Sequence, residues 1–298
     1  TAKVSALEVI DNNAAADGTD TTRVRVTVKD AHENPVAGQA VSFDAGTGVI
    51  IPATAETGKD GTVTVSQTSL KAGEFQVNAT IGDNWLHAKS VLVTFTADSS
   101  TAKVSALEVI DNNAVADGTD TTRVRVTVKD AHENPVVGQV VSFDAGTGVI
   151  IPATAETGKD GTVTVSQTSL KAGEFQVNAT IGDNWLHAKS VLVTFTADSS
   201  TAKVSALEVI DNNAVADGTD TTRVRVTVKD AHENPLAGQV VNFRAGEGVI
   251  LPATAETGKD GTVTVSQTSL KAGEFRVEAT TGDNWTQAKS GQVTFTAD

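Results

Sequence analysis

The chain consists of three successive copies of one segment, two of 100 residues and a third of 98. The opening stretch Thr1–Ile10 recurs unchanged from Thr101 and again from Thr201. The third copy stays in register with the others, and the first two differ at only three positions: Ala15/Val115, Ala37/Val137 and Ala40/Val140. A period of this length exceeds the usual solenoid unit of about 20 to 50 residues and matches a common domain size. The sequence therefore predicts three domains, modules 1, 2 and 3, at residues 1–100, 101–200 and 201–298.

The composition excludes several kinds of partner and site. A formal net charge of -14 would repel phosphate backbones, so we expect no nucleic-acid partner. The absence of cysteine excludes disulfides, thiolate metal ligands and cysteine nucleophiles. No apolar run approaches the roughly 18 residues of a membrane span, and no secretory leader opens the chain, so we expect no membrane insertion by this fragment. Because it starts at Thr1 without Met, we expect a piece of a longer protein.

Apolar residues alternate with polar ones along each module. In Thr22–Lys29, three valines fall on one face of an extended chain, and arginine, threonine and lysine fall on the other. The same period of two recurs in five further stretches, at 7–9, 41–43, 63–65, 75–79 and 91–95. Turn signals such as Asn34-Pro35 and Asp60-Gly61 separate them. The pattern predicts an all-β fold, in which each module is an antiparallel two-sheet sandwich with immunoglobulin-like topology.

The connection between modules is short and lacks flexible residues. Between Phe95 and Val104 there is neither glycine nor proline, so free reorientation of the modules is not expected. Strands of this length predict about 35 to 40 Å per module and a total on the order of 110 Å. The sequence therefore predicts three sandwiches arranged end to end as a rod.

Candidate catalytic and metal-binding residues are few. His32 and His87 have no nucleophile nearby in sequence, and Gln287 stands where the first two copies have histidine. An oxygen-rich cluster could attract Ca²⁺, but its spacing departs from the calcium-loop pattern and equally suits a turn; it comprises Asp11, Asn12, Asn13, Asp17 and Asp20. We therefore expect no catalytic residue, no cofactor and no metal site, and we expect the protein not to be an enzyme.

The third copy becomes more polar around its tryptophan turn. Five residues of module 2, at positions 181, 186, 187, 191 and 192, are replaced by Thr281, Thr286, Gln287, Gly291 and Gln292. By alternation, the leucine at position 92 faces outward. We hypothesise that one cluster packs each module against its C-terminal neighbour, with neutral drift as the alternative; the cluster is Ile81, Trp85, Leu86 and Leu92 in module 1 and Ile181, Trp185, Leu186 and Leu192 in module 2.

The ordered set of turn and strand motifs covers each module nearly end to end. It comprises Asn12-Asn13-Ala14 with Ala16-Asp17-Gly18, Val24–Asp30, Asn34–Gly38, Val41-Ser42-Phe43 and Thr57–Val65. On these motifs the modules resemble the bacterial immunoglobulin-like domains, group 1, of intimin and invasin adhesins.

The resemblance implies a passenger segment of an inverse-autotransporter type surface adhesin, acting in cell adhesion or biofilm formation and in virulence. Such a protein would be extracellular, on the bacterial cell surface, and anchored in the outer membrane through a part of the parent protein outside this chain. The repeats would be a structural stalk that extends a distal binding region, with neighbouring repeats as partners. Alternatively, they bind host-cell or matrix proteins, or like molecules on other cells, through exposed sheet faces and edges.

Overall fold

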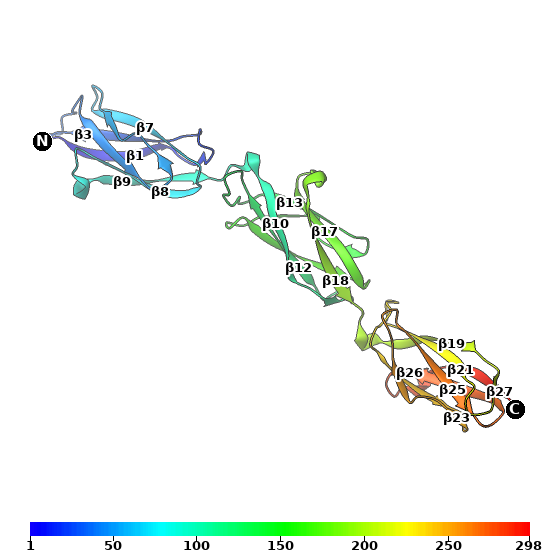
Figure 1. Cartoon of the computed structure of the whole chain (residues 1–298). Coiled ribbons are helices and arrows are strands. Elements are labelled where there is room, and N and C mark those ends of the chain that lie inside the picture. Colours follow the sequence, from blue (N-terminus) through cyan, green and yellow to red (C-terminus); the bar gives the residue numbers. More distant parts are fainter.

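Each module folds into two sheets packed face to face, as the alternation predicts. The computed structural model describes residues 1–298, and its regular structure consists of strands with five short 3-10 turns. None of the helical segments is long and apolar enough to cross a membrane. Figure 1 shows the three sandwiches following one another, with the two chain termini at opposite ends of the molecule. The prediction of an all-β rod of tandem sandwiches is confirmed.

The two sheets of module 1 have four and five strands. The first has the order β1-β3-β7-β5, built from β1 (Lys3–Asp11), β3 (Thr22–Lys29), β7 (Thr62–Ser69) and β5 (Val49–Ile50). The second has the order β2-β9-β8-β4-β6, built from β2 (Ala14–Ala15), β9 (Lys89–Thr96), β8 (Gly73–Thr80), β4 (Ala40–Ala45) and β6 (Thr54–Glu56). Pairing is antiparallel except between β2 and β9, which run parallel.

Modules 2 and 3 repeat this topology strand for strand. Module 2 contains β10 (Lys103–Asp111), β11 (Ala114–Val115), β12 (Thr122–Lys129), β13 (Val140–Ala145), β14 (Val149–Ile150), β15 (Thr154–Glu156), β16 (Thr162–Ser169), β17 (Gly173–Ile181) and β18 (Lys189–Thr196). Module 3 contains β19 (Lys203–Asp211), β20 (Ala214–Val215), β21 (Thr222–Lys229), β22 (Val240–Ala245), β23 (Val249–Ile250), β24 (Thr254–Glu256), β25 (Thr262–Ser269), β26 (Gly273–Thr280) and β27 (Lys289–Thr296). The 3-10 turns are η1 (Trp85–His87), η2 (Ser99–Thr101), η3 (Trp185–His187), η4 (Ser199–Thr201) and η5 (Trp285–Gln287).

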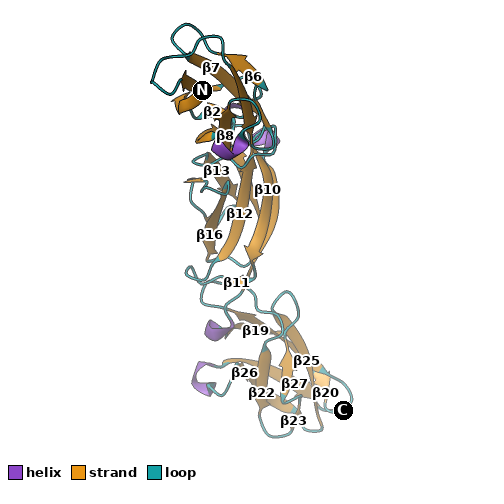
Figure 2. Cartoon of the chain, turned by 90° about the vertical axis from the view of Figure 1, so that its left-hand side faces the viewer, coloured by secondary structure: helices purple, strands orange, loops and turns teal.

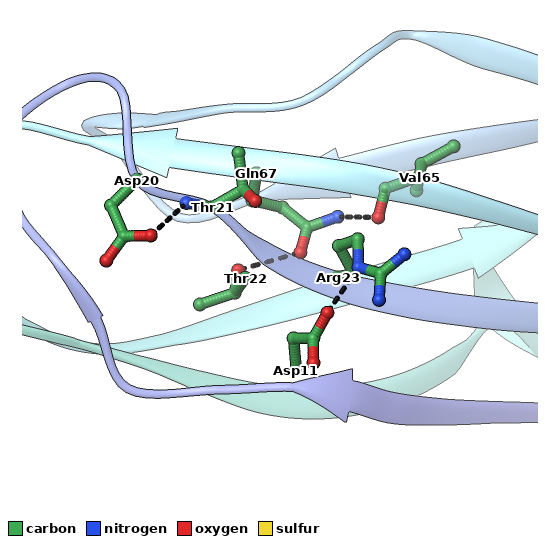
Figure 3. A network of polar contacts seen from close by, with 7 residues as sticks. All are labelled: Asp11, Asp20, Thr21, Thr22, Arg23, Val65 and Gln67. Atoms are coloured by element: carbon green, nitrogen blue, oxygen red, sulfur yellow. Dashed lines mark hydrogen bonds and ion pairs between the residues drawn. The ribbon is translucent and has the colours of Figure 1, made fainter.

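Strand β3 shows how the alternation builds both faces of a sheet. Its three valines are fully buried, whereas Arg23 and Arg25 point outward. The β1–β3 register places Arg25 opposite Glu8, whose Oε1 lies 2.6 Å from the arginine Nη2, and Arg23 opposite Asp11, with which it forms an ion pair (Figure 3). These pairs are half-exposed, so they add little stability and serve mainly to cover the outer face with matched charge.

The core between the sheets is mostly aliphatic and also contains Phe43, Phe75 and Phe95. Phe95 is almost fully buried, and Phe75 packs edge-on against it with 6.1 Å between ring centroids. The largest buried polar side chain is Gln67, which is fully buried, accepts a hydrogen bond from the Thr22 hydroxyl at 2.8 Å and donates to the Val65 carbonyl at 3.0 Å (Figure 3). Because both ends of its amide are paired, its burial carries no unsatisfied group.

The connection between modules is ordered. Residues Ser99–Thr101 form η2, which Asp98 caps by accepting a hydrogen bond from the Ser100 amide at 3.0 Å. Ala97 and Ala102 pack against the core of module 2. The view in Figure 2, turned by 90°, also shows the modules in single file. The linker is therefore held by the module that follows it.

Candidate functional site

At the joint between modules 1 and 2, polar side chains of one repeat bind main-chain atoms of the repeat before it. The C-terminal half of the joint is the turn from Asp130 to Asn134, which follows β12. In this turn the Asp130 amide donates to the Asn134 carbonyl at 2.9 Å, and Glu133 adopts a left-handed conformation with φ of 68°. The Asp130 carboxylate accepts from the amides of His132 and Asn134 at 2.8 and 2.9 Å. The aspartate thus fixes the shape of the turn from within.

Asn134 carries the contact to module 1. Its Oδ1 accepts a hydrogen bond from the Ala72 amide at 2.9 Å, and its Nδ2 donates to the Leu70 carbonyl at 2.9 Å. The same Nδ2 donates to Asp130 Oδ2 at 3.0 Å, which aims the amide at module 1. Asn134 therefore grips main-chain atoms of the Leu70–Ala72 turn with both its donor and its acceptor.

The Leu70–Ala72 turn connects β7 to β8 at the C-terminal end of module 1. The Ser69 hydroxyl shapes it, donating to the Lys71 carbonyl at 2.8 Å and accepting from the Lys71 amide at 2.9 Å. The turn then leads into Gly73, whose φ of 139° is readily adopted only by glycine. Its main-chain groups are consequently presented in a fixed arrangement to the next module.

Two further bonds attach the linker to the same aspartate turn. The Asp98 amide donates to Asp130 Oδ2 at 2.9 Å, and the Ala131 amide donates to Thr101 Oγ1 at 3.0 Å. The joint between modules 2 and 3 repeats all of these contacts between modules within 0.1 Å, through Asp230 and Asn234. The two joints are therefore the same structure built twice.

Burial distinguishes the joint residues from their copies at the free end. Asp130 is fully buried and Asn134 is 5% exposed, and Asp230 and Asn234 have the same values. In module 1, which has no module before it in this chain, Asp30 is half-buried and Asn34 is exposed. The adjacent apolar residue follows the trend, since Val136 is buried and Val36 is not. Each joint therefore takes the aspartate, the asparagine and the adjacent apolar residue of the following module out of water.

The charge of Asp130 is held in the joint by hydrogen bonds. Burial acts to raise the pKa of this carboxyl, but bonds from the Asp98 amide and from the side chain and amide of Asn134 outweigh it and leave the pKa below the ordinary value. The same causes lower the pKa of Asp230. Both carboxyls are therefore ionised at neutral pH, with their oxygens engaged as acceptors.

The residues predicted to pack a module against its C-terminal neighbour lie elsewhere. Turn η1 is at the N-terminal end of module 1, where Ile81, Asn84 and His87 line a shallow cleft with Lys3 and Glu33. The physical reason is topological: β9 must leave the module at its C-terminal end, so the turn that precedes β9 lies at the opposite end.

Exposure shows that this cluster also stays outside the joint in module 2. Leu86 and Leu186 are both 95% exposed, and Trp85 and Trp185 are both 41% exposed, although only module 2 has a preceding neighbour. Leu92 and Leu192 likewise keep identical exposure. Ile81 and Ile181 pack against the cores of their own modules. The packing between modules thus belongs to Asp130, Asn134 and the Leu70–Ala72 turn, which the hypothesis did not include.

In module 3 the tryptophan turn has a different local partner. The Arg244 guanidinium carbon lies 4.3 Å from the centre of the Trp285 ring, a cation–π contact, and Asp44 stands at the equivalent position in module 1. Arg244 also pairs with Glu278. The polar substitutions of the third copy therefore accompany a new charged cover for this tryptophan.

The oxygen-rich cluster of the first loop is arranged as turn caps. Asp17 Oδ1 accepts from the amides of Thr19 and Asp20 at 2.8 and 2.7 Å, which lowers the pKa of Asp17. Asn12 Oδ1 accepts from the Thr94 amide at 2.8 Å, and Asp11 pairs with Arg23. Asn13 adopts a left-handed conformation. These oxygens hold the loop and do not converge on one point.

One protein family matches the sequence of each of the three modules. All three modules fit a single family model, bacterial Ig-like domain (group 1), over residues 4–96, 104–196 and 204–296. The chain belongs to this family. The resemblance to group 1 bacterial Ig-like domains of intimin and invasin adhesins, predicted from the sequence motifs, is confirmed.

The curated relatives of this Ig-like chain include an inverse autotransporter adhesin and intimins. It is 30% identical over 289 residues to the inverse autotransporter adhesin YeeJ of Escherichia coli (strain K12), covering 94% of this chain and 12% of that protein. It is 31% identical over 229 residues to intimin of Citrobacter freundii, covering 74% of this chain and 22% of intimin. The chain thus spans less than a quarter of the length of these curated relatives.

Solved structures share the fold of the Ig-like chain. FdeC, an Escherichia coli adhesin, aligns with a TM-score of 0.65 at 22% identity, covering 98% of this chain and 96% of that one. Invasin, a bacterial integrin-binding protein, aligns with a TM-score of 0.54 at 22% identity, covering all of this chain and 60% of that one. At these identities the likeness concerns the architecture of serial sandwiches.

Proposed function

We propose that the three Ig-like repeats form a semi-rigid stalk of a bacterial surface adhesin. The stalk stands outside the cell, extends a distal binding region and is anchored in the outer membrane through a part of the parent protein outside this chain. The parent protein acts in adhesion to host cells or in biofilm formation, and the stalk itself neither binds a receptor nor carries out catalysis. The observation that carries this proposal is the repeated joint, in which a buried aspartate and an asparagine hold main-chain atoms of the preceding module.

A stalk needs resistance to bending more than it needs a pocket. Each joint combines two bonds from Asn134 or Asn234 to the preceding turn with two bonds between the linker and the aspartate turn. A neutral intramolecular hydrogen bond contributes about 1 kcal/mol, so a joint resists opening by a few kcal/mol before any apolar burial is counted. Such a joint stays aligned most of the time and yields under load.

A second function is favoured by one observation. In modules 1 and 2, Trp85 and Leu86, with their copies Trp185 and Leu186, present a partly exposed indole beside a fully exposed leucine. Tryptophan is enriched among the residues that dominate binding energy at protein interfaces, and two copies would add avidity. The alternative is therefore that the repeats themselves bind a host or neighbouring-cell protein through these turns.

One pair of measurements on the purified 298-residue chain separates the two functions. For the stalk, we expect small-angle scattering to give a rod with a maximum dimension on the order of 110 Å. We also expect the fluorescently labelled chain to show no saturable binding to epithelial cells, matrix proteins or itself at micromolar concentration. A flexible, collapsed ensemble would contradict the stalk. Saturable binding that is lost in a Leu86→Thr, Leu186→Thr variant, which copies the third repeat, would establish the alternative.

A further inference from the structure

A polar cleft opens beside the tryptophan turn of every module. In module 1 its volume is about 600 Å³, and modules 2 and 3 have copies of about 600 and 580 Å³. Such volumes lie within the range of small-ligand sites, about 300 to 1,000 Å³. One wall is the start of β1, and the other is η1 with the start of β9. All lining residues of each cleft belong to one module, so the cleft does not depend on a neighbouring module.

The cleft has two free cations in a chain that is acidic as a whole. Lys3 from β1 and Lys89 from β9 line it, and neither forms an ion pair within the chain. Its one acidic lining residue, Glu33, is paired with Lys29, whose Nζ lies 3.7 Å from the glutamate Oε1. The net charge of -14 is spread along the rod, and charges more than about 8 Å away are largely screened at physiological salt. The cleft is therefore locally cationic.

Uncharged polar groups complete the lining. The hydroxyls of Ser5 and Thr80 donate to main-chain carbonyls at 3.2 and 2.8 Å and keep their lone pairs as acceptors. The side chain of Asn84 makes no capping hydrogen bond to its own turn, and His87 lies beside it in the lining. The neighbouring indole of Trp85 is 41% exposed.

This set of side chains matches the chemistry of an acidic sugar. Lysines bind sulfate and phosphate oxygens as point charges. Amide and imidazole groups exchange hydrogen bonds with ring hydroxyls, and an exposed indole offers an apolar face to the ring carbons. A bare anion would leave the neutral groups unused, and an apolar ligand would desolvate the cations without pairing them.

Module 3 has a natural variant of the cleft. Gln287 replaces the histidine, and the Asn284 Oδ1 accepts from the Thr286 hydroxyl at 2.6 Å, a bond that the leucine of the other modules cannot make. An arginine also covers the tryptophan ring. The lining nevertheless keeps both lysines, Lys203 and Lys289. Module 3 therefore retains the cations and has fewer free neutral groups.

We propose that the cleft between the start of β1 and η1 binds a saccharide that carries a sulfate or phosphate group. Lys3 and Lys89 bind the anionic group, and Asn84 and His87 bind ring hydroxyls. Modules 1 and 2 bind more tightly than module 3. Because exposed charge pairs contribute little, a single sugar binds in the millimolar range. Such a site gives no saturable binding at micromolar concentration, so the cleft adds to the role of a stalk and does not replace it.

The test follows the indole N–H signals of the full chain, isotope-labelled at tryptophan, by NMR. Turns η1, η3 and η5 each begin at a tryptophan, so each of the three signals reports on one cleft. At constant ionic strength, glucose 6-sulfate or glucose 6-phosphate should shift the signals of Trp85 and Trp185 saturably and that of Trp285 less. The anion that binds more tightly distinguishes a sulfated glycan outside the cell from a phosphorylated saccharide of the envelope. Equal shifts with uncharged glucose, or no saturation with either anionic sugar, would overturn the proposal.

Matched variants establish which cations bind. Lys89→Gln with Lys189→Gln should lower the affinity of modules 1 and 2 about tenfold, because each removes a charge-assisted hydrogen bond. Lys59→Gln with Lys159→Gln makes the same change in net charge at exposed positions outside the clefts and should have no effect. Unchanged affinity in the first variant, or an equal loss in the second, would also overturn the proposal. Unchanged unfolding midpoints verify that both variants are folded.

Module 3 allows the reverse experiment. Thr286→Leu with Gln287→His gives it the residues of module 2 and releases the Asn284 side chain from its bond. The Trp285 signal should then saturate at a lower sugar concentration. An unchanged titration would contradict the role of Asn84 and His87. None of these variants should alter the rod in small-angle scattering, so failure of the cleft and failure of the stalk are distinguishable.

Discussion

Among single residues, the asparagine of the Asp130–Asn134 turn is the one whose chemistry cannot be replaced. Asn134 uses Oδ1 as an acceptor for Ala72 and both hydrogens of Nδ2 as donors, one to Leu70 and one to Asp130. A carboxylate lacks the donors and a longer glutamine would displace them, so only this amide fits both partners. The contact is specific because the Ala72 amide and the Leu70 carbonyl belong to module 1, Asn134 belongs to module 2, and these two main-chain groups have no other hydrogen-bond partner.

We predict that Asn134→Ala loosens the first joint. The variant leaves the Ala72 amide and the Leu70 carbonyl without their partner, which costs about 1 to 3 kcal/mol of joint stability. NMR relaxation should then show module 1 tumbling more independently of modules 2 and 3, while the second joint stays intact. Asn34→Ala is the matched control, since Asn34 has no neighbouring module in a single chain. Equal behaviour of the two variants would contradict this role for Asn134.

At the scale of elements, the Asp30–Asn34 turn and its copies pack against the turn between β6 and β7 and its copies. Gly61 has a φ of 76°, and its carbonyl accepts from the Val28 amide at 2.8 Å. A Cβ on Gly61 would lie 2.8 Å from the Pro35 Cβ and 2.9 Å from the Val28 carbonyl oxygen. Pro35 follows Asn34 directly. The absence of a side chain at Gly61 therefore allows the Asp30–Asn34 turn to pack against the sheet.

We predict that alanine at Gly61, Gly161 and Gly261 together lowers stability far more than alanine at Gly82, Gly182 and Gly282. Both sets have positive φ, which costs about 1 kcal/mol or more per residue for alanine. Only the first set meets backbone atoms closer than 3 Å, whereas the second has nothing within 4 Å. Urea unfolding monitored by circular dichroism should show a clearly lower midpoint for the first triple variant. Similar midpoints would show that the turn relaxes freely.

The same elements show how far the sequence could be interpreted. Alternation in Thr22–Lys29 predicted β3 and its buried face correctly, because each of its residues meets either the core or water. The two-residue strands β2 and β5 are too short to show a period. The tryptophan turn was assigned to the wrong end because apolar composition, and not strand direction, guided the hypothesis. The Asn134 contact could not be predicted, since its partners are more than 60 residues away.

For the whole molecule, the joints make the rod sensitive to acid. Asp130 and Asp230 have a lowered pKa in the folded chain, so their contribution to stability is complete above the ordinary value of 3.8 and is lost as the pH falls through the folded value. Protonation removes an acceptor from each joint. Asp17 and Asp60 also have a lowered pKa through local turn bonds, so the modules themselves weaken in the same direction.

We predict that acidification bends the rod. Small-angle scattering should give a shorter maximum dimension and a more flexible profile below the ordinary aspartate pKa than at neutral pH. A variant with Asp130→Asn and Asp230→Asn should be more flexible at neutral pH and should respond less to acid, because its joints have no charge left to lose. Asp30→Asn serves as the control at the free end. An acid response that the double variant keeps in full would place its origin within the modules.

One side of every joint consists of main-chain atoms, and this affects how such a protein changes its length. The asparagine binds the amide of Ala72 and the carbonyl of Leu70, and it makes no hydrogen bond to their side chains. A module duplicated by recombination therefore arrives with a fitting surface at both ends, and no compensating substitution is needed in its neighbours. The length of the rod can thus be increased or decreased in a single genetic step, one module at a time.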